Sequence, residues 1–222
     1  MSALSELAHP DLEDATAEEV LGYVVDRFHP RLYVACSFQK EASVILDMLV
    51  RIEPSARFFV IDTGVLFDET YATWRRVEER YGITIDVYRG LSLAEQAARH
   101  GEALWARDPD ACCAIRKVAP LDEALADVDA WVSGLRREQS PSRATTPKLA
   151  WDHRHGLWKA NPLAGWTERD VWRYLAAHDV PYHPLHDRGY ASIGCTHCTA
   201  PGDRRDGRWA GRDKSECGMH AS

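Results

Sequence analysis

The chain has 222 residues, of which 45% are hydrophobic and 27% charged, and its formal net charge at pH 7 is −7. These proportions are typical of a soluble domain with its own core, and the negative charge argues against a general nucleic-acid binder. No apolar run approaches the roughly 20 residues needed to cross a bilayer. The N-terminal MSALSELAHPDLED lacks the pattern of a signal peptide, so we expect a cytoplasmic protein with reduced cysteines and no membrane partner.

Strand and helix patterns alternate along the chain. Thr16 and Glu19 form a capping box ahead of apolar residues at helical spacing. In chain order the sequence predicts a helix after Thr16, a strand at 32–37, a helix over about 41–52, a strand at 57–62, a helix over about 68–81, a strand at 84–88, a helix over about 92–100, a strand at 130–134 and a helix capped by Thr167. This alternation predicts an α/β fold with a mainly parallel sheet flanked by helices.

Three polar stretches follow predicted strands, where ligands bind in such sheets. They are SFQKEAS (37–43), DTG (62–64) and SGLRREQS (133–140). The first leads directly into a helix, so its backbone N–H groups and Lys40 could hold an anion. It is not a Walker A loop, because it lacks the glycines and the Lys-Ser/Thr ending. Arg136 and Arg137 offer two guanidinium groups to a phosphate or sulfate, although a surface ion-pair cluster is the competing interpretation.

The last part of the chain is basic. The stretch DRRDGRWAGRDK (203–214) places five cations in a glycine-rich segment of an otherwise acidic protein. This pattern is compatible either with a local site for a small anion or with a solvated mobile tail.

Four of the six cysteines form two pairs that are distant in sequence. Cys112 and Cys113 are adjacent, and Cys195 and Cys198 form a C-x-x-C motif. Four thiols are enough for a Cys₄ zinc or iron–sulfur site. Structural zinc usually takes spaced pairs, whereas adjacent thiolates can each reach a different iron of a cubane cluster. The pairs therefore favour a [4Fe–4S] cluster over zinc or ordinary buried cysteines.

The remaining two cysteines differ in setting. Cys36 lies on an apolar strand and is interpreted as a core residue. Cys217 lies near the C-terminus in KSECGMH, after the basic stretch and three residues before His220. Neighbouring cations would favour its thiolate, so it is either a nucleophile or an inert cysteine of the tail.

Taken together, these residues resemble the iron–sulfur type of assimilatory adenosine 5′-phosphosulfate (APS) reductase, of the sulfonucleotide reductase family. The resemblance runs from about residue 30 to the end. It rests on the motifs SFQKEAS, DTG, CCAIRK, SGLRREQSPSRA, NPLAGWTERDVWRYL, LHDRGYASIGCTHC, GRW and ECGMH, in this order. The family implies a PP-loop, adenine nucleotide α-hydrolase-like fold.

The resemblance also implies a reaction and a set of roles. APS and reduced thioredoxin, a separate protein, would give sulfite, AMP and oxidised thioredoxin through an S-sulfonate on Cys217. The implied catalytic residues are Cys217, His220 and Lys117. The implied substrate-binding residues are Ser37, Gln39, Lys40, Asp62, Thr63, Gly64, Arg136, Arg137 and Arg208. The implied ligands of a [4Fe–4S] cluster that does not change redox state are Cys112, Cys113, Cys195 and Cys198.

Two departures from the family pattern matter. The first loop contains no glycine, whereas many PP-loop relatives carry one, and no thioredoxin-like domain is fused to the chain. Relatives without the cysteine pairs usually prefer 3′-phosphoadenosine 5′-phosphosulfate (PAPS), so the pairs favour APS, although some cluster-bearing relatives accept both.

The predicted organisation has three parts. Residues 1–30 form an N-terminal helical segment, residues 31–206 the nucleotide-binding reductase domain with the iron–sulfur site, and residues 207–222 a mobile tail with the catalytic cysteine. The competing functions are a PAPS or dual reductase, a PP-loop tRNA thiolase, and a non-catalytic cluster or zinc sensor that binds a partner protein. A homo-oligomer is left open.

Overall fold

The elements follow the predicted alternation. We describe residues 9–220 of a computed structural model. The strands are β1 Leu32–Ala35, β2 Arg57–Ile61, β3 Ile85–Tyr88, β4 Ala130–Val132, β5 Leu149–Asp152 and β6 Leu157–Ala160. The α-helices are α1 Ala17–Phe28, α2 Lys40–Ile52, α3 Asp68–Tyr81, α4 Leu93–His100, α5 Leu104–Arg107, α6 Pro109–Cys113, α7 Ala119–Ala124 and α8 Glu168–His178. A π-helical segment, η1 Ala114–Val118, joins α6 to α7, and short 3₁₀ segments are η2 Arg137–Gln139, η3 Pro141–Arg143, η4 Pro184–Arg188 and η5 Thr196–Cys198.

One six-stranded sheet organises the molecule, with strand order β3-β2-β1-β4-β6-β5. All neighbouring pairs are parallel except β5 and β6, which form an antiparallel hairpin at one edge. The chain moves from β1 outward to β3 and then returns to place β4 on the other side of β1. The strand order therefore reverses between β1 and β4, and a ligand crevice is expected beyond their carboxyl ends.

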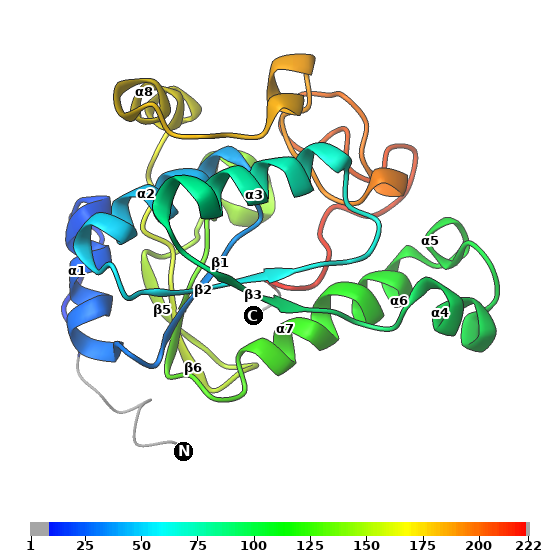
Figure 1. Ribbon diagram of the computed structural model, residues 1–222, viewed down its shortest axis with the longest axis horizontal. Helices are drawn as coiled ribbons and strands as arrows, with labels where there is room; N and C mark the ends of the chain where they lie inside the picture. The colour runs from blue at the N-terminus through cyan, green and yellow to red at the C-terminus, as the bar shows by residue number, and fades with distance from the viewer. Residues whose placement is uncertain (1–8, 221–222) are drawn as a thin grey trace.

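Helices cover both faces of this sheet (Figure 1). The larger core joins α1, α2, α3 and α8 to one face and includes Val34, Phe58 and Val132. The smaller core lies on the opposite face against α7 and includes Tyr33 and Trp131. Adjacent strand residues thus point to opposite faces, and both faces are buried, as a parallel sheet requires. The predicted α/β fold is confirmed.

Helix starts follow local capping chemistry. Thr16 accepts a hydrogen bond from the Glu19 amide and the Glu19 carboxylate accepts one from the Thr16 amide, which completes the predicted capping box of α1. Thr167 caps α8 in the same way. Since α1 packs in the main core, the predicted N-terminal segment joins the domain from residue 17 onward, and its residues 1–8 lie outside the described residues.

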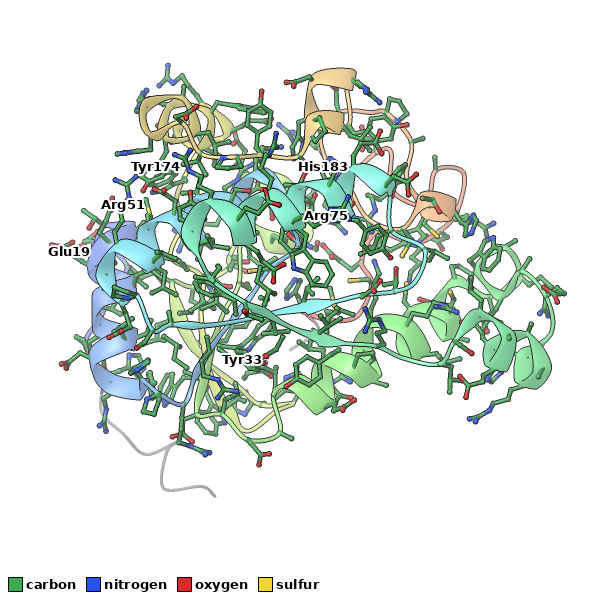
Figure 2. The ribbon with its side chains drawn as sticks, in the orientation of Figure 1. Glu19, Tyr33, Arg51, Arg75, Tyr174 and His183 are labelled. Carbon is green, nitrogen blue, oxygen red and sulfur yellow. The ribbon has the colours of Figure 1, made fainter. Side chains whose placement is uncertain are left out.

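Buried polar contacts hold the layer that α8 and η4 form over α2 and α3. Tyr174 on α8 and Arg51 on α2 lie close together in Figure 2, and both donate hydrogen bonds to the buried Asp47 carboxylate. His183, which has no exposed surface, lies with Nε2 2.9 Å from the Thr70 hydroxyl on α3. These contacts fix the segment that continues to Cys195. Among residues 9–220, no helix is both long and apolar enough to span a membrane.

Candidate active site

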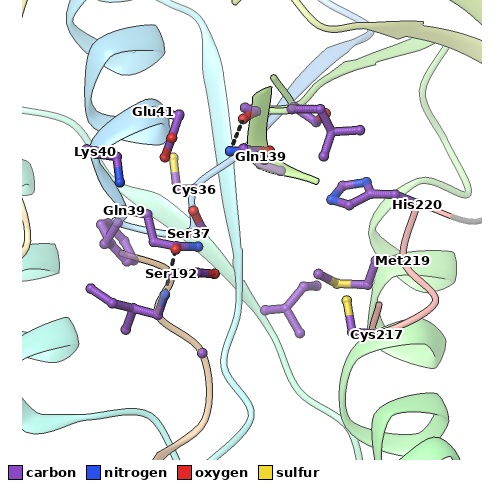
Figure 3. Close-up of a pocket in the computed structure, with 18 of the residues that line it drawn as sticks. Cys36, Ser37, Gln39, Lys40, Glu41, Gln139, Ser192, Cys217, Met219 and His220 are labelled. Carbon is purple, nitrogen blue, oxygen red and sulfur yellow. Dashed lines mark hydrogen bonds between the residues drawn. The ribbon is translucent and has the colours of Figure 1, made fainter. Parts of the chain in front are cut away.

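A cavity of about 230 Å³ opens at the carboxyl ends of β1, β2 and β4. The three polar stretches singled out in the sequence all contribute to its wall. Its lining includes Ser37, Gln39, Lys40, Thr63, Lys117, Arg136, Arg208, Cys217 and His220 among the residues predicted for the site. In Figure 3 the residues of the first loop form one wall, and Cys217, Met219 and His220 lie on the opposite side. The reversal of strand order thus creates the crevice expected from it.

The first loop is held in shape without glycine. Phe38 adopts a left-handed conformation, with φ of 56°, which costs energy for a residue with a Cβ. Its side chain is buried and stacks on Trp74 of α3, with ring centroids 5.6 Å apart. Packing of the phenyl ring therefore stabilises a backbone shape that glycine provides at no steric cost.

Two loop side chains bind the segment that follows η4. The Gln39 Oε1 accepts a hydrogen bond from the Ile193 amide at 2.7 Å, as Figure 3 shows. The Lys40 ammonium, which is 2% exposed, donates to the Ala191 carbonyl at 2.9 Å and lies 3.4 Å from a Glu168 carboxylate oxygen. The loop and this segment therefore form one rigid wall.

The two ends of the cavity differ in charge. At the loop end, Arg136 pairs with Glu41 and Glu138, and Lys40 pairs with Glu168, so three carboxylates accompany two cations. At the Cys217 end, Lys117 and Arg208 act on the thiol, and Arg143 and Arg205 share the single carboxylate of Glu216, so cations are in excess. The buried Nε atoms of Arg205 and Arg208 have no hydrogen-bond partner in the described structure. Free guanidinium donors at this end provide a binding site for an anion.

Arg208 reaches the cavity because of a glycine. A Cβ at Gly194 would lie 2.3 Å from Nη2 of Arg208, so a larger residue would displace the guanidinium. Arg208 also donates to the Ile193 carbonyl, which fixes it against the segment bound by the first loop.

The C-terminal segment, residues 207–220, is docked against the domain. Glu216 receives two hydrogen bonds from Arg143, at 2.8 and 2.7 Å, and a third from Arg205 at 3.1 Å. Arg154 donates to the Gly218 carbonyl at 3.3 Å. A mobile tail was predicted; the described part of it is anchored by ion pairs, and residues 221–222 lie outside the described residues.

Docking buries Cys217, whose exposed fraction is 8%. Burial acts to raise the pKa of the thiol, but Lys117, the Met219 backbone and Arg208 outweigh it and hold the pKa below 9.0. A thiolate at this position is a competent nucleophile.

His220 lies on the platform of the smaller core. Its ring stacks on Trp131 with centroids 5.6 Å apart and planes inclined by 11°, and it lines the same cavity as Cys217. Burial, followed by the charges of Lys159, Arg143 and Arg205, lowers the pKa of His220 well below 6.5. The imidazole is therefore neutral at physiological pH.

The four paired cysteines line a second, smaller pocket, together with Lys117. Lys117 thus contributes to both cavities. Among residues 9–220, no three His, Cys, Asp or Glu side chains converge closely enough to hold one metal ion. Two buried donors lining this pocket, Arg116 Nη2 and Trp209 Nε1, have no hydrogen-bond partner in the described structure.

Three predicted substrate contacts are not among the lining residues. Asp62 accepts hydrogen bonds from the Gly64 amide, the Tyr71 hydroxyl and Arg89, so it shapes the turn after β2. Arg137 points away from the cavity, donates to the Thr146 carbonyl and pairs with Glu13. The substrate roles of Asp62, Gly64 and Arg137 stay predictions.

Other residues of the cavity were not singled out from the sequence. Arg143 and Arg205 lie within the motifs SPSRA and DRRD, but spacing alone could not show that both meet Glu216. One feature of the sequence could have indicated them. Glu216 precedes Cys217 in ECGMH, and a carboxylate needs a cationic partner when it is buried.

Comparison with known proteins assigns the chain to a family. Residues 31–201 match the phosphoadenosine phosphosulfate reductase domain. The chain is 48% identical to the APS reductase of Lysinibacillus sphaericus, covering 92% of this chain and 90% of that one. It is 47% identical to the PAPS reductase of Gloeobacter violaceus, over 94% and 90% of the two chains.

Solved structures support the same family assignment. The crystal structure of the PAPS reductase from Candida auris in a phosphate complex has a TM-score of 0.76 and 31% identity, covering 87% of this chain and 99% of that one. The FMN adenylyltransferase of Candida glabrata, at a TM-score of 0.59, 16% identity and coverage of 90% and 70%, shares only its fold with this chain. This chain therefore belongs to the PAPS/APS (sulfonucleotide) reductase family of oxidoreductases that act on a sulfur group.

Proposed function

We propose that this protein reduces APS to sulfite and AMP, with a separate dithiol protein of the thioredoxin type as reductant. The observation that carries the proposal is the placement of Cys217. Its buried thiol faces a cavity that is cationic around it and is walled by the first loop on the other side. That arrangement suits a nucleotide at the loop and a transferring anionic group at the sulfur.

In the first step the Cys217 thiolate attacks the sulfur atom of the phosphosulfate. A sulfur–sulfur bond forms, the bond from sulfur to the bridging oxygen breaks, and AMP leaves with the electron pair. Negative charge then increases on the leaving phosphate, where Lys117 and Arg208 would stabilise it. The product on the enzyme is an S-sulfonate of Cys217.

In the second step a thiolate of the reductant attacks the Cys217 sulfur. Sulfite leaves with the electron pair of the sulfur–sulfur bond, and a mixed disulfide joins the two proteins. The second thiol of the reductant resolves this disulfide, so the dithiol supplies both electrons and Cys217 returns to the thiolate.

A [4Fe–4S] cluster fits the chemistry of the cysteine pocket. Its four thiols lie around one space, and a cubane spreads its ligands over four irons, so they need not converge on one point. The unpartnered donors Arg116 Nη2 and Trp209 Nε1 would suit the sulfur atoms of a cluster. When bound, the cluster would supply negative charge beside Lys117 and would join two distant segments. We propose Cys112, Cys113, Cys195 and Cys198 as its ligands.

The loop end of the cavity supports APS over PAPS. Arg136 and Lys40 are already paired there with three carboxylates, Glu41, Glu138 and Glu168. A 3′-phosphate at that end would meet uncompensated negative charge. The alternative is a PAPS or dual reductase, which the kinship with a PAPS reductase favours.

We retain the predicted organisation, a reductase domain at 31–206 followed by a catalytic tail, and a cytoplasmic location. A non-catalytic sensor would explain the four paired cysteines but would leave Cys217 and the cationic end of the cavity without a role.

Intact mass tests the proposal most directly. Protein purified without oxygen is incubated with APS or with PAPS in the absence of a reductant. We expect a mass gain of one SO₃ group with APS that maps to Cys217, and none in Cys217→Ser. No adduct with either nucleotide, from protein containing its full iron, would contradict the proposal, and an adduct with PAPS alone would establish the alternative.

A further inference from the structure

Three neighbouring strands build a rigid support beneath the C-terminal segment. Trp131 of β4 and Lys159 of β6 are register partners in the parallel ladder, so their side chains lie on the same face of the sheet. The Lys159 ammonium lies 4.7 Å from the centre of the Trp131 ring. The indole Nε1 donates to Asp152 of β5 at 3.1 Å, and Trp131 is 1% exposed. This support therefore cannot rotate freely.

His220 rests on this support at two points. Its ring is stacked on Trp131, and its Nδ1 lies 3.3 Å from Nζ of Lys159. A lysine ammonium has three donors and no acceptor, so Nδ1 must accept this hydrogen bond. A neutral imidazole carries one proton, which then sits on Nε2. Within residues 9–220 no protein group is bonded to Nε2, and the residue lines the cavity beside Cys217.

We propose that Lys159, steadied by Trp131, is a positioning residue that holds His220 as the neutral tautomer protonated on Nε2. His220 then donates a hydrogen bond from Nε2 to the anion in the cavity, and it does not act as a base towards the Cys217 thiol. The identity of that anion, a phosphosulfate, rests on the proposed function. The tautomer does not depend on the proposed function: it rests on the contacts of His220 with Lys159 and Trp131 and on the charge of Lys159.

The surrounding charges agree with a neutral ring. Four cations from separate elements act on His220: Lys159 on β6, Arg143 on η3, Arg205 in the loop after η5, and Lys117 on η1. The acidic groups in this region are Glu216 and the Cys217 thiol, both on the segment that carries His220, while Asp152 acts on Lys159. A positive charge on the ring would be repelled by all four cations. A neutral imidazole N–H is an established kind of donor to developing negative charge.

The ammonium form of Lys159 is essential to this arrangement. Burial lowers the pKa of Lys159 to about 8, so the group is charged at pH 7 and loses its proton above pH 8. A deprotonated amine no longer compels Nδ1 to accept, and the hold on the tautomer ends.

Nitrogen NMR of the holoprotein tests the tautomer without reference to activity. The chain has 10 histidines, and the ¹⁵N-labelled variant His220→Asn identifies the signals of His220 by their loss. We expect the wild type to show a proton on Nε2 and a hydrogen-bonded acceptor at Nδ1 near neutral pH. In Lys159→Met, the Nδ1 signal should move to that of a free acceptor and the pKa of His220 should rise. A proton on Nδ1 in the wild type, or unchanged signals in Lys159→Met, would overturn the proposal.

Kinetics supply the second readout. Lys159→Met should lower kcat by about tenfold or more, with a much smaller change in KM, since a misplaced donor weakens stabilisation of the transition state. Lys159→Arg keeps a charged, donor-only group, so it should retain the Nε2 tautomer that Lys159→Met loses. In the wild type we expect activity to fall above pH 8, where Lys159 loses its proton, and Lys159→Arg should not show this fall. Lys148→Met serves as the control, because the Lys148 ammonium donates to the Glu13 and Ala15 carbonyls, away from His220. A lower kcat with an unchanged pH profile would assign Lys159 a structural role only. If neither nucleotide is turned over, the proposed function fails, while the NMR result still decides the tautomer.

Discussion

The Glu216 side chain joins the C-terminal segment to the domain through two arginines. Its carboxylate is partly buried, with 28% of the side chain exposed, and it binds Arg143 and Arg205. Burial acts to raise the pKa of this carboxyl, but Arg143 and Arg205 lower it below 4.5, so Glu216 stays charged at neutral pH. Charge-assisted hydrogen bonds of this kind contribute about 1.5–3 kcal/mol.

Glu216→Gln should therefore weaken the docking of residues 207–220. We expect amide hydrogens of that segment to exchange about tenfold faster or more, because each 1.4 kcal/mol lost corresponds to roughly a factor of ten. Asp213→Asn, an exposed change in the same segment, is the matched control. Equal exchange in Glu216→Gln and the wild type would show that these ion pairs do not hold the segment.

For single residues, the sequence indicated which side chains belong near the site better than it indicated which partners they bind. Arg136 and Arg137 are adjacent and look equivalent in SGLRREQS, yet Arg136 is buried against Glu41 and Arg137 pairs with Glu13. The choice depends on carboxylates 95 and 124 positions away in the chain, which spacing within a motif cannot show. The role of Asp62 likewise depends on partners outside the DTG motif, Tyr71 and Arg89.

Among the elements, the π-helical segment η1 carries Arg116 and Lys117 between the paired cysteines and α7. It crosses very near Gly90, where a Cβ would lie 2.1 Å from the Ile115 carbonyl oxygen. This neighbour is backbone, so it cannot move aside without shifting the helix.

Gly90→Ala should displace η1. We expect a loss of roughly 1–3 kcal/mol in the free energy of unfolding, as for other overpacked sites, together with less iron bound per chain. Denaturant unfolding and iron analysis are the measurements. Gly22→Ala in α1, where a Cβ meets nothing within 4 Å, should keep the iron and change stability by less than about 1 kcal/mol. Full iron in Gly90→Ala would contradict the steric argument.

The β5–β6 hairpin was not predicted, whereas the predicted strands at 32–37, 57–62, 84–88 and 130–134 match observed strands to within two residues at either end. The central strands β1 and β4 are apolar runs because both faces of a parallel sheet are buried, whereas the edge strand β3 carries Asp86. A four-residue loop, 153–156, closes the hairpin, and it lacks the Asn-Gly or Asp-Gly pair that marks two-residue hairpin turns in a sequence. Its shape comes from Asp152, which accepts hydrogen bonds from the Arg154 and His155 amides, and from Gly156 at a φ of 67°.

The hairpin loop also holds a pH-sensitive contact. His155 lies between Asp152, at 2.8 Å, and Asp122 of α7, at 3.0 Å. Burial acts to lower the pKa of His155, but the hydrogen bonds and charges of Asp152 and Asp122 raise it above 6.5. Because the pKa is higher in the folded state, the stabilisation is complete below pH 6.5 and is lost as the pH rises through the folded pKa.

His155→Gln should therefore be less stable than the wild type in acid, by about 1 kcal/mol, and the difference should shrink in alkali. Urea unfolding of both proteins from about pH 5.5 to about pH 8.5 measures this difference. A difference that is constant or grows with pH would mean that the charge of His155 is not the source of the contact.

For the molecule as a whole, the cysteine pocket joins segments that lie more than 80 positions apart in sequence, at the end of α6 and around η5. Since metal binding is coupled to folding, a bound cluster would hold the α4–α7 region to the segment that leads into the tail. Iron content should therefore affect the stability of the entire domain.

Cys112→Ser should lose the bound iron and the visible absorption of the proposed cluster, and its melting temperature should fall. Cys36→Ala is the control, because Cys36 belongs to the main core and should leave the iron content unchanged. Iron analysis, the visible spectrum and thermal unfolding report the outcome. Full iron in Cys112→Ser would show that the ligand set is wrong.

The docked C-terminal segment has a consequence for the order of events. With 8% of Cys217 exposed, the sulfur is within reach of a small nucleotide in the cavity but not of another folded protein. In the proposed two-step reaction, the segment would therefore have to detach after sulfur transfer and before the reductant attacks. Detachment would separate the S-sulfonate of Cys217 from the AMP formed with it, and it would open the Cys217 sulfur to the dithiol of the reductant. The same ion pairs that orient the nucleophile would in this way set the sequence, and in part the rate, of catalytic turnover.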